Sequence, residues 1–242
     1  RLPEGHAQLA TAINGLGENA RARGEVQEAV ALFEEAIGIW REALGPWHPF
    51  VGVALNNMAK AQVALGDAEA GLLLLQKSVA VKREALGDSH PSLATSLNHL
   101  AALTETTSKD YERSAAMRTE ALEILKKSLG EMHPQVAVQA NNLAVTLSRQ
   151  QRYAEASSLY QEALKIDEET YGPVHPQVAT DLNNLATLAF HCGEQHLSRQ
   201  LYERALDIRE QALGDDDAKT QATRRNLELV RRQIEVSDSE EE

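Results

Sequence analysis

Four histidines that each precede a proline are the first residues whose type and spacing suggest chemistry: His48, His90, His133 and His175. Because histidine is the commonest metal ligand, a regular set of four raises the question of a metal site. Proline, however, suits the first position of a helix, where its missing N–H would have no partner. Helix starts in successive units lie on the order of 10 Å or more apart, which is too far to share one ion. We therefore expect these histidines to cap helices and to bind no metal.

Pairs of asparagines recur along the same sequence and could bind a peptide. An asparagine amide offers two donors and one acceptor, so a row of amides can hold the backbone of an extended peptide whatever its side chains. Alternatively, one asparagine of each pair bonds to neighbouring helices and sets their spacing. The full pairs are Asn56–Asn57, Asn141–Asn142 and Asn183–Asn184, and the weaker copies are Asn98–His99 and Asn14–Gly15.

No group of residues forms a catalytic pattern. The sequence has no glycine-rich phosphate loop, no His-Glu-x-x-His and no Gly-x-Ser-x-Gly, so we expect no enzyme and no cofactor. Cys192 follows His191, but adjacent residues on a helix point apart, and we expect Cys192 to be a small buried apolar side chain. The acidic run 215–217 could attract a cation, although capping of the helix that follows is the simpler role.

Composition excludes several classes of partner and site. The 242 residues carry 24 Lys and Arg against 36 Asp and Glu, a net charge of −12, which disfavours nucleic acid and anionic lipid. A single cysteine excludes a disulfide framework and fits a reducing compartment, and the apolar runs are too short to span a bilayer. We expect a cytoplasmic protein. An organellar stroma or matrix is the alternative, because a chain that begins at Arg1 without Met is expected to be truncated or processed.

A repeat of about 42 residues must position these side chains. The His-Pro pairs recur at intervals of 42, 43 and 42 residues, and glycines at 45, 87, 130, 172 and 214 keep the same period. Only 4% of residues are aromatic, and abundant Ala and Leu favour closely packed helices, so the fold class is predicted to be all-α. In one unit, a first helix runs from Pro49 to about Leu65, and a second runs from about Ala68 to Gly87, a typical helix-ending residue.

Five such units are predicted, followed by a capping helix and an acidic disordered tail. Small residues mark where the two helices of a unit approach each other: Ala59, Ala101, Ala144 and Ala186 in the first helix, and Ala36, Ser78, Ala121, Ala163 and Ala205 in the second. The solenoid is assigned to residues 1–232, with units at about 6–45, 48–87, 90–130, 133–172 and 175–214, the capping helix at 217–234 and the tail at 235–242.

The fifth unit carries a family resemblance. Residues 171–186 read Tyr-Gly-Pro-Val-His-Pro-Gln-Val-Ala-Thr-Asp-Leu-Asn-Asn-Leu-Ala, and Leu201-Tyr202 and Ala205-Leu206 follow. This pattern resembles the tetratricopeptide repeat of the kinesin-light-chain kind, over about residues 6–230. The resemblance implies a right-handed superhelical α-solenoid whose first helices line a concave groove. The heptad region that joins kinesin light chain to its motor is missing from this sequence, so membership of a motor complex is not implied.

The resemblance also implies which residues face the groove. Carried over position by position, they are the asparagine pairs with their weaker copies and, one or two turns later, Glu18, Lys60, Arg149, Thr187 and His191. The cations and histidines among them favour an acidic peptide. The predicted peptide-binding set is Asn14, Asn56, Asn57, Lys60, Asn98, His99, Asn141, Asn142, Arg149, Asn183, Asn184 and His191.

Some segments depart from the repeat. The third unit is one residue longer and its turn at 106–110 lacks glycine, so we expect a longer or distorted turn near Ser108. Trp47 and Phe50 stand where other units have smaller residues. They form either an apolar patch for a partner or a filler of the seam between units. Ser237 and Ser239 precede acids and suit an acid-directed kinase.

Three functions remain open at this point. The first is an adaptor or scaffold that binds a protein or peptide segment in its groove. The second is a structural subunit of a larger complex, which contacts partners through its edges or convex face. The third is a regulatory segment of an enzyme whose catalytic domain lies outside this sequence. The first is preferred, with protein or peptide partners, no nucleic acid and no direct insertion into a membrane.

Overall fold

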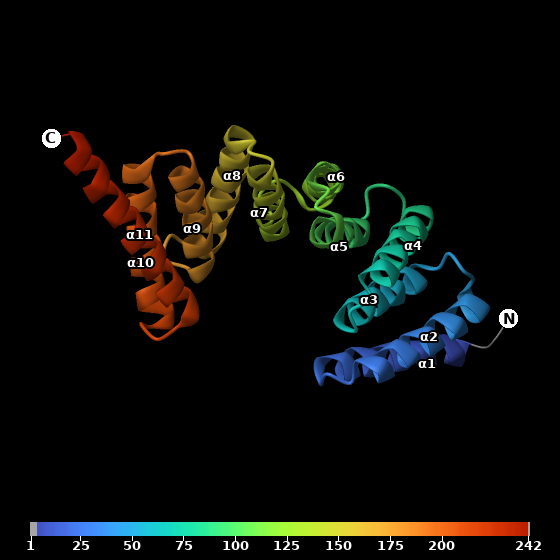
Figure 1. Cartoon of the computed structure of the whole chain (residues 1–242). Coiled ribbons are helices and arrows are strands. Elements are labelled where there is room, and N and C mark those ends of the chain that lie inside the picture. Colours follow the sequence, from blue (N-terminus) through green and yellow to red (C-terminus); the bar gives the residue numbers. More distant parts are fainter. Residues whose placement is uncertain (1–3, 242) are drawn as a thin grey trace. The chain divides into compact units, whose positions relative to one another are not determined.

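The computed structural model describes the backbone of residues 4–241 and the side chains of residues 6–237. Within that range the chain forms eleven α-helices and no strand, which confirms the all-α prediction. Figure 1 shows the two helices of each pair running antiparallel, side by side. The helices are α1 Glu4–Ala22, α2 Val26–Leu44, α3 Pro49–Ala64, α4 Ala68–Leu86, α5 Pro91–Ser108, α6 Tyr111–Leu129, α7 Pro134–Arg149, α8 Tyr153–Tyr171, α9 Pro176–His191, α10 Gln195–Leu213 and α11 Ala218–Glu241.

The helices form two compact units, each a stack of consecutive repeats. Arg1–Gly130 contains three helix pairs, α1 to α6, and Glu131–Glu242 contains two pairs and the last helix, α7 to α11. Within each unit, consecutive helices pack against each other. The repeats continue across this division, although the interval that ends at Gly130 and His133 is 43 residues where the other intervals are 42.

The recurring His-Pro pairs begin helices as predicted. The Nδ1 atoms of His48, His90, His133 and His175 each accept a hydrogen bond from the backbone N–H two residues later, at 3.1–3.3 Å. The following prolines are the first residues of α3, α5, α7 and α9, where a missing N–H leaves nothing unsatisfied. These four starts match the predicted positions, whereas α1 begins at Glu4, three residues before the predicted position 7.

Small buried residues let the helices of each pair approach closely. Every alanine and serine predicted for this role is at most 1% exposed. In α1, the position of Ala59 is taken by Gly17, which lies against the fully buried ring of Phe33. A Cβ atom added to Gly17 would lie 2.7 Å from a carbon of that ring.

We expect Gly17→Ala to destabilise the chain by about 1–3 kcal/mol, because the stiff Phe33 ring has to move. Urea unfolding measures the change. The matched control combines Gly17→Ala with Phe33→Leu, which installs the residues found at the same positions of the next pair, Ala59 and Leu75. This double variant should recover much of the loss, and an unchanged midpoint in the single variant would contradict the packing argument.

The extra residue of the third repeat lies in a longer helix and not in a longer turn. Helix α5 has 18 residues, whereas α3, α7 and α9 have 16 each. The connection to α6 shrinks to Lys109 and Asp110, and Lys109 adopts the left-handed conformation with φ 55°. Hydroxyl groups of Thr106, Thr107 and Ser108 bond to carbonyls of the preceding turn. The prediction of a longer turn is therefore wrong, although the short connection is distorted.

The last helix closes the second unit. The Asp217 carboxylate accepts hydrogen bonds from the N–H groups of Lys219 and Thr220 at 2.8 and 3.2 Å, which confirms its predicted capping role. Helix α11 buries Leu227, Val230 and Ile234 against α9 and α10. It continues to Glu241, where a disordered tail was expected from residue 235. No glycine or proline interrupts residues 218–242, and glutamate favours helix. Ser237 lies in this helix, and the Ser239 side chain lies outside the described residues.

Candidate functional site

In four of the five copies, the first asparagine of the pair bonds to another helix. Asn56 Oδ1 lies 2.8 Å from His99 Nδ1 on the next first helix, α5. Asn98 Oδ1 accepts a hydrogen bond from Arg118 at 2.8 Å, and Asn183 Oδ1 accepts one from Thr223 at 3.3 Å. Asn141 Nδ2 donates to Asp181 at 2.5 Å. These amides join neighbouring helices, as the alternative interpretation of the pairs proposed. Asn14 is half-buried, and its side-chain oxygen has no hydrogen-bond partner.

The second asparagines differ from the first. Asn57 donates to Glu18 of α1 at 2.6 Å, so it also links two first helices. Asn142 and Asn184 are half-buried, and no side-chain hydrogen bond connects either amide to another described residue. In the two asparagine pairs of the second unit, these are therefore the amides that remain available to a ligand.

A pocket of about 450 Å³ lies among α7, α8 and α9. Three predicted peptide-binding residues line it together: Arg149 at the end of α7, and Asn184 and His191 on α9. Thr187, also predicted to face the groove, lies between the latter two. The complete lining is Val145, Ser148, Arg149, Gln151, Tyr153, Tyr160, Asn184, Thr187, Leu188 and His191.

Tyr153 and Tyr160 line this pocket and make it more polar than the sequence suggested. Burial raises the pKa of Tyr160, while a hydrogen bond with Ser148 and the nearby charge of Arg149 oppose that shift. The Thr187 hydroxyl lies 2.7 Å from the hydroxyl of Tyr202 on α10. The exposed Arg149 adds a positive charge at the pocket. A guanidinium, a free amide and phenol hydroxyls together suit a peptide carboxylate and backbone.

A second pocket, of about 360 Å³, lies in the first unit between α3 and α5. It brings together the predicted residues Lys60 and His99, and adds Arg21 of α1 to apolar side chains such as Val63 and Leu103. Burial lowers the pKa of Lys60, and Arg21 lowers it further, while Glu18 opposes both. Burial, together with the charges of Lys60 and Lys82, lowers the pKa of His99 to about 4, so this imidazole is neutral at pH 7.

The polar pocket residues that sequence reasoning missed include Tyr160 of the second helix α8 and Arg21 of the first helix α1. Tyr160 occupies the tyrosine position of the repeat, where Tyr202 stands in the next pair. That position was noted as part of the motif but not assigned to the groove side. Arg21 lies about one helical turn after the predicted groove residue Glu18, so it could have been predicted by extending the groove positions along α1 by one turn.

Two further predictions concern side chains outside the pockets. Cys192 is exposed, where a buried side chain was expected, because it follows the end of α9 instead of lying on its inner face. Trp47 is 55% and Phe50 45% exposed. The Phe50 ring also contacts Trp40 and His48, with ring centres 5.4 and 4.8 Å apart. Phe50 therefore partly fills the seam between α2 and α3, and Trp47 lies at the surface.

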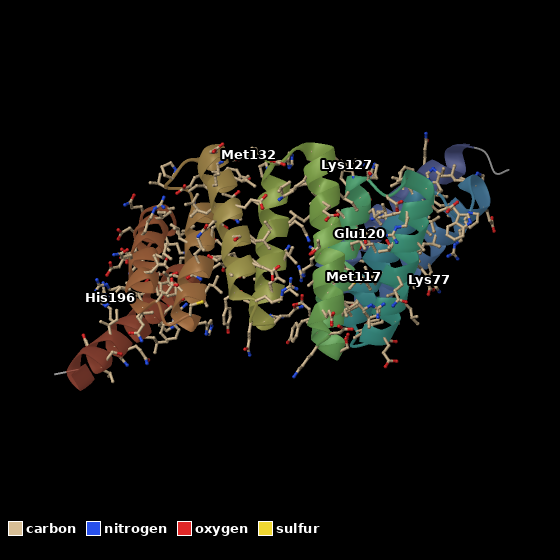
Figure 2. All side chains as sticks on the ribbon, turned by 90° about the horizontal axis from the view of Figure 1, so that it is seen from above. Lys77, Met117, Glu120, Lys127, Met132 and His196 are labelled. Carbon is tan, nitrogen blue, oxygen red and sulfur yellow. The ribbon has the colours of Figure 1, made fainter. Side chains whose placement is uncertain are left out.

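The second helices carry exposed polar side chains, some labelled in Figure 2, such as Lys77 of α4 and His196 of α10. Glu120 of α6 pairs with Arg83 of α4. Among the described residues, no three His, Cys, Asp or Glu side chains gather as metal ligands. Every helix in the described range is too short or too polar to cross a lipid bilayer.

Comparison with known proteins agrees with this architecture. The model of the family described as "Tetratricopeptide repeat" matches residues 8–84, 99–169 and 135–211. A search of curated proteins gave no match.

Solved structures show the same fold at low sequence identity. TPR-like repeats from a Podosopora anserina protein described as a kinesin light chain superpose with a TM-score of 0.76 at 24% identity, covering 87% of this chain and 98% of that one. BtubC (BKLC) from P. vanneervenii gives 0.78 at 22% identity, covering 86% and 83%. The apo form of RapI gives 0.72 at 15% identity, covering 95% and 85%.

Proposed function

The chain belongs to the tetratricopeptide repeat family, whose fold serves protein–protein interaction and scaffolding, and from this premise we propose that it binds an extended, acidic segment of a partner protein. The proposed role is that of a non-catalytic adaptor or scaffold. The observation that carries the proposal is the pocket among α7, α8 and α9, where Arg149, Asn184 and His191 converge.

Charge and hydrogen-bonding capacity support an acidic ligand. The chain as a whole carries −12, so an acidic segment gains affinity only where cations are gathered. Arg149 provides such a charge at one pocket, and Lys60 and Arg21 provide it at the other. Complementary charge of this kind favours the correct partner and speeds its association. The free amide of Asn184 can bond to a peptide backbone of any sequence.

The experiment compares two charge reversals in the full chain. A library of extended peptides that differ in Asp and Glu content provides the probe, and fluorescence anisotropy measures the affinity. We expect Arg149→Glu to weaken the best acidic binder by roughly tenfold, which is about 1.4 kcal/mol. The control Arg232→Glu changes the net charge equally on the exposed face of α11 and should leave affinity unchanged. Rising salt should weaken the wild-type complex as well.

Equal losses of peptide affinity in both variants would mean that the overall charge of the chain, and not the charge at the pocket, sets the affinity. A lack of preference for acidic peptides in the wild type would reject the acidic ligand itself. Circular dichroism of each variant verifies that helicity is preserved.

A second function, assembly through an edge, is favoured by a separate observation. The residue before the helix-starting histidine is apolar and exposed in three of the four His-Pro connections: Trp47, Met132 and Val174. Exposed apolar side chains are typical of a contact with another protein, and Met132 and Val174 repeat this feature within the second unit. Trp47→Ser, which copies Ser89 of the remaining connection, should weaken such an assembly while leaving peptide affinity unchanged.

A further inference from the structure

Three of the seams where a second helix meets the next first helix bury a polar pair at one repeat position. Between α4 and α5, Lys82 donates to Ser96 Oγ at 2.8 Å and to the Ser92 carbonyl at 3.0 Å. Between α10 and α11, Arg209 bonds to Thr223 Oγ1. Each pair thus joins a cation to a neutral acceptor. The equivalent residues between α8 and α9 are two aspartates, Asp167 and Asp181.

The two aspartates are buried and contact each other. Asp167 is 1% exposed and Asp181 is fully buried, and their carboxyl groups are within hydrogen-bonding reach of each other. Asn141 of α7 donates to Asp181 Oδ1 at 2.5 Å, and the nearby Gln177 side chain lowers the pKa of Asp167. If both aspartates are ionised, the Oδ2 atom of each accepts no hydrogen bond. A single proton shared by the pair turns one acid into the donor that the other needs.

The charged groups around the pair do not replace that proton. On α8, Glu168 raises the pKa of Asp181 further, and its carboxylate is bonded to Arg204 of α10 at 2.5 Å. His175, at the start of α9, lowers the pKa of Asp167 when it is charged. From α7, the residue that reaches Asp181 is the neutral Asn141.

We propose that one proton held between Asp167 and Asp181 fastens α9 to α8, and that loss of this proton loosens the seam, which makes the second unit sensitive to pH. The inference concerns helix packing and does not rest on the proposed peptide binding. Two buried carboxyl groups within hydrogen-bonding reach of each other cannot both be charged without strong repulsion.

The direction of the titration agrees with the geometry. Burial raises the pKa of Asp181 to about 7, and the neighbouring charge of Asp167 adds to the effect. Burial also raises the pKa of Asp167. A group whose pKa is raised on folding contributes stability at low pH and loses it as pH rises through the folded value. The seam should therefore be tight near pH 5 and weaker above pH 7.

The test is hydrogen exchange of the full chain, followed by mass spectrometry in a chelating buffer and corrected for the intrinsic effect of pH. Between pH 5 and pH 7 we expect the opening constant of α9 to rise roughly 10- to 50-fold in the wild type. In Asp181→Asn the amide can donate to Asp167 at every pH, so the opening constant should change little. Glu169→Gln removes an exposed acid from the same helix, α8, and should keep the wild-type response.

The infrared band of a protonated carboxylic acid provides a second readout. It should be present in the wild type at pH 6 and lost in Asp181→Asn. Should Asp181→Asn fail to fold, Asp167→Asn takes its place with the same expectations. An identical pH response in wild type and variant overturns the proposal. Protection restored by Ca²⁺ or Mg²⁺ at pH 8 in the wild type alone overturns it in another way, because the pair would then hold a cation.

Discussion

Arg118→Ala is expected to destabilise the first unit by about 3–5 kcal/mol, because it leaves a carboxylate buried without its cation. Arg118 Nε donates to Glu105 Oε1 at 3.1 Å, and the two side chains are only 8% and 4% exposed. Ser114 also donates to Glu105, at 2.5 Å, and Arg118 reaches Asn98 at 2.8 Å. Urea unfolding of the full chain measures the loss.

The chain offers its own control for this prediction. At the same repeat positions of the next helix pair, Glu105 is replaced by Ser148 and Arg118 by Tyr160, two neutral side chains that line one pocket. The double variant Glu105→Ser with Arg118→Tyr should therefore recover most of the stability lost in Arg118→Ala. If Arg118→Ala lowers the free energy of unfolding by less than about 1 kcal/mol, the Arg118–Glu105 pair contributes no more than an ordinary surface ion pair. That result would contradict the prediction.

Acid should destabilise the first unit, whereas the second unit is expected to be weakened by rising pH. The His99 pKa is lowered to about 4 from the usual 6.5, so folding favours the neutral imidazole and stability is lost as pH falls from 6.5 to 4. The full difference corresponds to about 3 kcal/mol; because His99 is partly exposed, we expect about 2 kcal/mol after solvent screening. Lys82, whose pKa is lowered to about 8, adds stability as pH rises from 8 towards 10.5.

Tryptophan fluorescence separates the two units in this measurement. Both tryptophans, Trp40 and Trp47, belong to the first unit, so their signal follows its unfolding alone. His99→Asn copies Asn57, Asn142 and Asn184 at the same position and should remove the loss between pH 6.5 and pH 4.5. If acid lowers the urea midpoint of this variant as much as that of the wild type, another group is responsible.

Much of the fold was predictable because its signals are local. A proline after a histidine and a glycine after a hydrophobic residue act on their own turn of chain, so the starts of α3, α5, α7 and α9 followed from sequence. The length of α5 did not follow, because it depends on Lys109 adopting a left-handed conformation without glycine. Cys192 was misplaced for a similar reason, since the end of α9 decides whether it faces inward.

The site was only partly predictable, because an amide in a sequence does not reveal which way it points. The register of the repeat identified Arg149, Asn184 and His191, which the structure places in one pocket. It could not tell Asn184, whose amide is available, from Asn183, which bonds to Thr223. The aspartate pair was missed because Asp167 and Asp181 appear unusual only when each is compared with the same position in other repeats.

The residues at the helix seams differ between repeats, and this difference affects which helices dock against each other while the chain folds. In the native register Asp181 meets a like residue, whereas the same position of other seams carries Lys82 or Arg209, which would attract a carboxylate. Charge alone therefore favours misaligned docking of α9. The four-residue connection from α8 to α9 opposes this, because a short loop closes with little loss of entropy. We therefore expect connectivity, and not seam charge, to keep these repeats in sequence order during folding.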